Sequence, residues 1–175
     1  ITDGQIFLET ELFHSGVVPA VNPGISVSRV GGSAQIKAMK KVASKLKLLY
    51  SQYIELKSFA QFGSDLDADT KERLALGERI VEILKQDKSS PVPVEKQVAI
   101  IYAATNGYLN DVKVPDVSAY EKEFYEFLDL RYSDLLDIVR KTGKLEDSGF
   151  ETLAEACREF TEKFRREHYH ITSEN

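Results

Sequence analysis

Apolar and polar residues follow different periods on the two sides of about residue 33. Before it, apolar side chains alternate with polar ones in two short runs, residues 5–9 and 25–28, which predicts short strands. After it, apolar residues recur every three or four positions to about residue 167, which predicts helices. The pattern therefore predicts a mainly α fold: a bundle of about five helices preceded by two short strands.

Glycines, prolines and capping residues set the ends of the predicted elements. Residues 14–24 contain two glycines and two prolines and predict a loop. Gly63, Gly107 and Gly143 each follow a helical pattern, as glycine usually does just beyond a helix C-terminus. The five helices are predicted from residue 33 or 34 to 60, from the acidic run 65–69 to 85, and over 94–105, 117–141 and 148–167.

Two short strands do not form a stable sheet by themselves. We therefore expect them to belong to a larger sheet outside this chain, and expect rapid amide exchange throughout residues 1–30 in a dilute monomer. The chain opens on Ile1 without a methionine, so we interpret it as a fragment or a processed product.

Composition narrows the class of protein. The 175 residues are 42% hydrophobic and 29% charged with a net charge of −5, which fits a globular domain and argues against nucleic-acid binding by bulk electrostatics. No apolar run approaches the roughly 20 residues that span a bilayer. The single cysteine, Cys157, makes no internal disulfide and is expected to pack in the core.

Arg29 is the first candidate for chemistry. It stands where the second predicted strand ends, and Gly31 and Gly32 allow the backbone to turn there. Its guanidinium offers a rigid fork of donors that suits phosphate oxygens. The alternative is an ordinary surface or salt-bridged arginine. Because the chain lacks a G-x-x-x-x-G-K-[ST] loop, a nucleotide that meets Arg29 must be held mainly elsewhere, by another chain.

Two further clusters favour structural roles. The run SDLDAD at 64–69 resembles the start of a calcium loop, but Thr70 and Leu76 occupy its glycine and last-ligand positions, so helix capping explains the acids better. His168 and His170 lack a third ligand, so we predict no metal site.

Four stretches of the chain resemble the α subunit of F-type ATP synthase. They are ITDGQIFLETELF (1–13), ISVSRVGGSAQIKAMK (25–40), FAQFGSDLD (59–67) and EKQVAIIYAATNGYL (95–109). They occur in order and at the spacing of the family, and the resemblance weakens after about Tyr120.

The resemblance implies three parts. Residues 1–33 would be the C-terminal end of an incomplete α/β nucleotide-binding domain, residues 34–170 a helical C-terminal domain, and residues 171–175 a tail. The phosphate-binding loop and the acid that handles Mg²⁺ would lie upstream of this chain.

The resemblance also implies a function. In the family, α and β subunits alternate in a ring around the rotating γ subunit, in a proton-translocating two-sector ATPase. The arginine that matches Arg29 reaches the nucleotide of the neighbouring β subunit as an arginine finger, an effect of order 10³ to 10⁵ in rate. We therefore expect a regulatory, non-catalytic α subunit that is inactive alone, with Arg29 as its catalytic contribution and the peripheral-stalk δ subunit as a further partner.

The same resemblance implies a non-catalytic nucleotide site. Phe13, Pro19 and Gln86 match residues around its adenine and ribose, so ATP or ADP with Mg²⁺ is the expected cofactor. Val18 and Lys88 depart from the arginine and glutamine of mitochondrial members.

Location and alternatives complete the hypothesis. The acidic turn at 64–69 would lie at the membrane-facing end of the ring, near the rotor. We expect the cytoplasmic side of a bacterial inner membrane, reached only through the complex, rather than a mitochondrial matrix or chloroplast stroma. The alternatives are a free-standing helical interaction module, which has no need for ISVSRVGG, and a related rotary or flagellar-type export ATPase, against which FAQFGSDLD argues.

Overall fold

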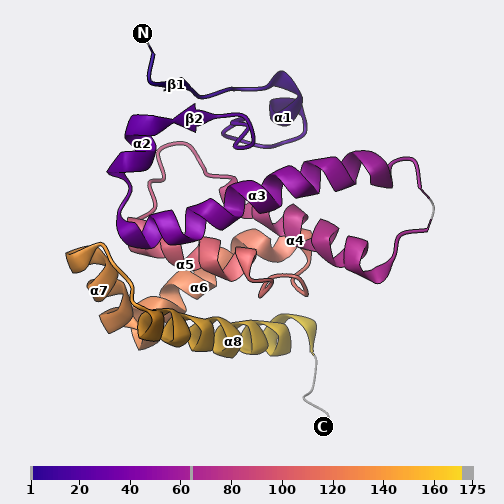
Figure 1. The fold of residues 1–175 in the computed structure, drawn as a ribbon. Coiled ribbons are helices and arrows are strands. Elements are labelled where there is room, and N and C mark those ends of the chain that lie inside the picture. Colours follow the sequence, from indigo (N-terminus) through magenta and orange to yellow (C-terminus); the bar gives the residue numbers. More distant parts are fainter. Residues whose placement is uncertain (1, 64, 171–175) are drawn as a thin grey trace.

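The computed structural model describes residues 2–63 and 65–170. Eight α-helices, one short 3₁₀ helix and two two-residue strands lie within this part of the chain. The mainly α fold predicted from the sequence is confirmed. In Figure 1 the strands lie on one side of the long helix α3, and the C-terminal helix α8 lies on the opposite side of the molecule.

The N-terminal segment holds the strands and one short helix. Strand β1 (Gly4–Gln5) pairs antiparallel with β2 (Val27–Ser28), and an isolated bridge joins Leu8 to Val21. Helix α1 (Thr10–His14) lies between the strands in the sequence. The strands are shorter than predicted, and they pair with each other.

The first long helix is interrupted near its start. Helix α2 (Arg29–Ala34) is followed by two extended residues before α3 (Lys37–Ala60) begins. The prediction of one helix from about residue 33, with a turn on Gly31 and Gly32, is therefore wrong. Both glycines lie inside α2, because the Ser28 hydroxyl caps that helix by accepting the Gly31 N–H at 2.9 Å.

The next helices agree with their sequence signals. Helix α4 (Ala68–Leu84) begins after Asp67, whose carboxylate accepts the Thr70 N–H at 2.7 Å, so the expected capping role of the acidic turn is confirmed. Helix α5 (Val94–Thr105) has the predicted bounds, and the 3₁₀ helix η1 (Val114–Asp116) follows in the linker.

The predicted fourth helix is two helices. Helix α6 (Val117–Arg131) ends at Tyr132, and α7 (Ser133–Thr142) starts after it. At the break, the Tyr132 hydroxyl donates to Glu159 at 2.9 Å, a contact that residue spacing along one helix does not reveal. Helix α8 (Asp147–Tyr169) closes the bundle.

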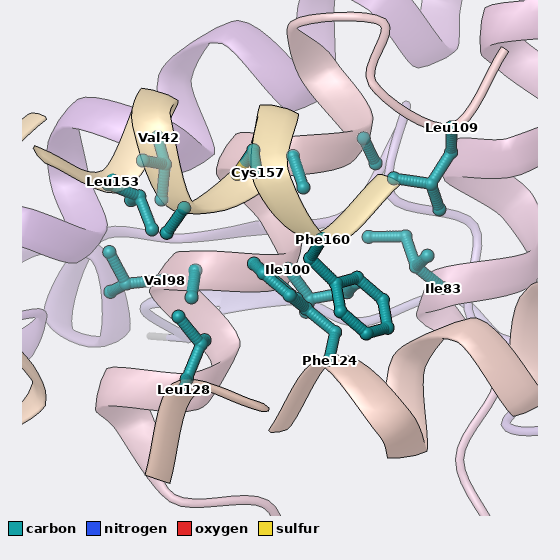
Figure 2. Packing of buried hydrophobic residues seen from close by; sticks show 14 of the residues in the cluster. Val42, Ile83, Val98, Ile100, Leu109, Phe124, Leu128, Leu153, Cys157 and Phe160 are labelled. Atoms are coloured by element: carbon teal, nitrogen blue, oxygen red, sulfur yellow. The ribbon is translucent and has the colours of Figure 1, made fainter. Parts of the chain in front are cut away.

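The core belongs entirely to the helical part. Among the described residues, the first buried side chain is Ala38, and the last is Phe164. Figure 2 shows Phe124 from α6, Phe160 from α8 and Ile100 from α5 packed together, with the two phenyl rings 5.2 Å apart. Cys157 lies in the same cluster and is fully buried, which confirms its packing role.

Candidate functional site

Arg29 is the first residue of α2, directly after β2. The Asp3 carboxylate fixes this corner, because it accepts the Val30 N–H at 3.0 Å and the Ser28 hydroxyl at 3.0 Å. The Ser28 oxygen in turn accepts the Gly31 N–H at 2.9 Å. The backbone that carries Arg29 is therefore held on both sides although it lies at the surface.

The Arg29 side chain itself is 86% exposed. Its Nε lies 3.6 Å from Asp3 Oδ1, an ion pair that is long and solvated and contributes little stability. Its donors can therefore meet an anion on another chain without breaking a buried interaction. The role of Arg29 stays a prediction.

Gln86 and the peptide between Val18 and Pro19 lie together, although some 67 positions separate them in the sequence. The Gln86 N–H donates to the Val18 carbonyl at 3.0 Å, and its Nε2 donates to the Ser90 carbonyl at 2.9 Å. Phe13 lies on α1 with 59% of its surface exposed.

A cavity of about 710 Å³ opens beside Gln86. It is lined by Gly16, Val18, Glu82, Lys85, Gln86, Asp87, Lys88, Ser90, Val92, Ser118, Glu121, Lys122 and Tyr125. Gln86 thus faces a space of the size that takes a nucleotide-sized ligand, whereas Phe13 and Pro19 do not line it.

Helix α6 supplies a wall of this cavity that sequence reasoning missed. The Tyr125 hydroxyl donates to Glu121 Oε1 at 2.6 Å. Burial raises the pKa of the Glu121 carboxyl, and burial together with that carboxylate raises the pKa of Tyr125. No motif marks these residues, because only the fold brings α6 to the loop after α4.

The residues present fit part of a nucleotide but not its metal ion. The Gln86 amide and the ammonium groups of Lys85, Lys88 and Lys122 offer donors to an adenine, ribose or phosphate. Within residues 2–63 and 65–170, no group of three or more His, Cys, Asp or Glu side chains is arranged to hold a metal. Any Mg²⁺ would need ligands from outside this part of the chain.

The α3–α4 turn carries exposed aromatic and acidic residues. Phe59 is 68% exposed and Phe62 is 91% exposed. Beyond them, the Thr70 N–H lowers the pKa of the Asp67 carboxyl that caps α4, and Asp69 pairs with Arg73 at 2.8 Å. Figure 1 shows this turn at the far end of the helix pair from α2.

The remaining candidates have structural surroundings. His168 Nε2 lies 3.0 Å from Glu123 Oε1, and its ring stacks on Phe164 at 4.0 Å. Burial raises the pKa of the Cys157 thiol, which makes it a poor nucleophile. None of the helices in the described parts of the chain has the length and apolar character that crossing a bilayer requires.

The fold and its exposed arginine define a class: a mainly helical domain attached to a short, strand-bearing segment that has no buried core of its own. Residues 35–160 match the family model for the C-terminal domain of ATP synthase alpha/beta chains. The chain belongs to this family, as the sequence resemblance predicted.

Two relatives show which member it resembles. The chain is 57% identical over 166 residues to the sodium ion specific ATP synthase subunit alpha of Acetobacterium woodii, which covers 95% of this chain and 33% of that protein. It is also 57% identical over 164 residues to the ATP synthase subunit alpha of Salinibacter ruber, 94% of this chain and 30% of that protein. The chain therefore corresponds to the C-terminal part of an α subunit and spans about a third of the length of these relatives.

Proposed function

We propose that this chain is the C-terminal part of the non-catalytic α subunit of an F-type ATP synthase. In the complex it alternates with β subunits around the γ subunit, contacts the δ subunit of the peripheral stalk through the rest of the α subunit, and hydrolyses nothing alone. The observation that carries the proposal is the 57% identity to proteins named ATP synthase subunit alpha over 95% of the chain. A free-standing interaction module would not share so much of both the strand-bearing and the helical parts.

Arg29 is the residue through which this chain takes part in the chemistry. Its guanidinium is solvent-exposed, its backbone is fixed by Asp3, and the segment lacks a phosphate-binding loop of its own. In the ring, it donates to the phosphoryl oxygens of a nucleotide held by the neighbouring β subunit and stabilises the charge that develops there.

The test is steady-state ATP hydrolysis by a reconstituted ring that carries Arg29→Ala in the full-length subunit. We expect a loss of about a thousandfold or more in kcat, with assembly and nucleotide affinity retained. Arg29→Lys keeps the charge without the planar fork and should recover only part of the rate.

The matched control is Arg73→Ala. Arg73 is also exposed and also pairs with one aspartate, Asp69. It should leave the rate unchanged. A loss below about tenfold for Arg29→Ala would make Arg29 an ordinary interface arginine.

The cavity beside Gln86 supports a second part of the proposal, a non-catalytic site for ATP or ADP. Gln86 and the nearby Pro19 and Phe13 surround the base and ribose, and upstream residues hold the phosphates and Mg²⁺. Val18 and Lys88 both line the cavity and change its polarity relative to the arginine and glutamine of mitochondrial members.

The coupling ion and the location belong to the complex. We propose proton flow and attachment to the cytoplasmic side of a bacterial inner membrane through other subunits. Since one relative is named sodium ion specific, synthesis driven by a proton gradient without sodium is the decisive measurement, and a strict sodium requirement would replace the proton in the proposal.

A further inference from the structure

A second, smaller cavity lies between the N-terminal segment and the helix pair α3–α4. Its volume is about 260 Å³. Its lining residues are all uncharged: Leu12, Val17, Pro19, Val21, Pro23, Tyr50, Val81 and Leu84. The first five come from the N-terminal segment and the last three from the helices, so the cavity spans the junction between the two parts of the chain.

Backbone hydrogen bonds hold the N-terminal wall of this junction cavity open. They pair Val17 N–H with the Leu12 carbonyl at 2.9 Å, Glu9 N–H with Ala20 at 2.9 Å, Asn22 N–H with Phe7 at 2.9 Å, and Gln86 N–H with Val18 at 3.0 Å. A wall braced in this way does not collapse into the space beneath it, so the cavity is preformed.

One polar group lines the junction cavity. Tyr50 is only 4% exposed, yet within the described residues no hydrogen bond reaches its hydroxyl. A buried hydroxyl without a partner is unfavourable, and it is the feature that a ligand would satisfy. Burial and the charge of Glu9 raise the pKa of Tyr50, so the hydroxyl keeps its proton at neutral pH.

We propose that the junction cavity binds a small, flat, apolar molecule of about two fused rings that carries one hydrogen-bonding group for the Tyr50 hydroxyl. A dry apolar cavity of about 150 Å³ takes up benzene. In proportion, about 260 Å³ takes a fused bicycle. Because the bound molecule touches both walls, it joins the N-terminal segment to α3 and α4. This inference goes beyond the proposed function and does not depend on Arg29.

The test uses the full-length subunit labelled at its valine and leucine methyl groups, titrated with indole and followed by NMR. Indole is flat and apolar, and its N–H donates to the Tyr50 hydroxyl oxygen. We expect saturable shifts of the methyl groups of Leu12, Val17, Val21, Val81 and Leu84. Absence of these shifts up to the solubility of indole, or shifts confined to other methyl groups, overturns the proposal. Filling of the cavity by residues upstream of this chain would give the first of these results.

Two kinds of variant separate the hydrogen bond from the cavity. Tyr50→Phe should weaken indole about fivefold to tenfold, the usual effect of one hydrogen bond, while leaving indene, which lacks the N–H, unchanged. Val81→Phe fills the space and should weaken both probes more than tenfold, with Leu84→Phe as the substitute if the first variant fails to fold. Equal losses of indole and indene in Tyr50→Phe, or undiminished binding in a filled variant, contradict the site.

Discussion

Gly77 marks the closest approach of α3 and α4. A Cβ atom at this position would lie 2.2 Å from Cγ of Tyr53, far inside van der Waals contact. The Tyr53 ring is itself 7% exposed and lies below the Lys57 ammonium, so it has little room to retreat. The spacing of the helix pair therefore depends on the absence of a side chain at residue 77.

Gly77→Ala should lower the free energy of unfolding by about 1–3 kcal/mol, the usual cost of overpacking. The cost should appear even though alanine favours a helix over glycine by about 1 kcal/mol. Urea unfolding measures it. Gly32→Ala is the control, since no atom lies within 4 Å of its added Cβ. Equal midpoints for the two variants would show that the helices do not approach so closely.

Glu121 is a half-buried carboxyl at the wall of the large cavity. Burial raises its pKa from an ordinary value near 4.5, and the hydrogen bond from Tyr125 offsets this only in part. Because the folded pKa exceeds the unfolded one, the contribution of Glu121 to stability is fully present below the unfolded pKa. It is lost as the pH rises through the folded pKa.

Glu121→Gln should therefore stabilise the protein at pH 7 and have little effect near pH 4, while the amide oxygen still accepts from Tyr125. Unfolding curves at the two pH values measure the difference. Glu126→Gln, an exposed change of the same charge on the same helix, should act alike at both. A Glu121→Gln effect that is independent of pH would contradict the burial of this carboxyl.

At the scale of elements, the last turn of α8 is fastened to η1. The Tyr169 hydroxyl donates to Asp116 Oδ2 at 2.7 Å and accepts the Lys113 N–H at 2.9 Å. One turn earlier, Arg165 pairs with Asp111 at 3.1 Å. The linker between α5 and α6 is thereby held by a helix that follows it by about 50 residues.

Tyr169→Phe should cost about 1–2 kcal/mol, since it removes two hydrogen bonds and keeps the ring. It should also speed amide exchange at Lys113, a readout specific to the lost acceptor. Tyr108→Phe is the matched control, because its hydroxyl makes no hydrogen bond within the described residues. If the Lys113 amide exchanges at the wild-type rate, this contact does not fasten α8.

Element boundaries show what sequence could predict. The bounds of α5 and the capping of α4 by Asp67 follow from local signals, and these local signals were sufficient. The break at Tyr132 was missed because a distant partner, Glu159, stabilises it. In the same way, the exposure of Arg29 and the pairing of Gln86 with Val18 could be described only with the fold known, since contacts across about 70 residues leave no local pattern.

At the scale of the whole molecule, the chain has two parts of unequal stability. Within the described residues, every buried side chain lies between Ala38 and Phe164. The segment before Lys37 is held by short strands, turns and the rim of the junction cavity. Its amides therefore open without unfolding the core.

Hydrogen exchange of this 175-residue chain should show that difference. Amides paired between β1 and β2 should exchange at least about a hundredfold faster than those of α5 and α6, because the strands bury no core. Comparable protection in both parts of a dilute monomer would mean that they unfold as one unit.

The contact of Gly77 with Tyr53 has a mechanical consequence. Only about seven residues of α3, near 10 Å, extend from Tyr53 to the tip that carries Phe59 and Phe62. The deflection of a loaded beam grows with the cube of its free length, so so short an overhang hardly bends. If a turning shaft presses on this tip, the load passes with little elastic loss through the glycine contact into the bundle, and the α subunit resists the shaft as a stiff bracket rather than a spring.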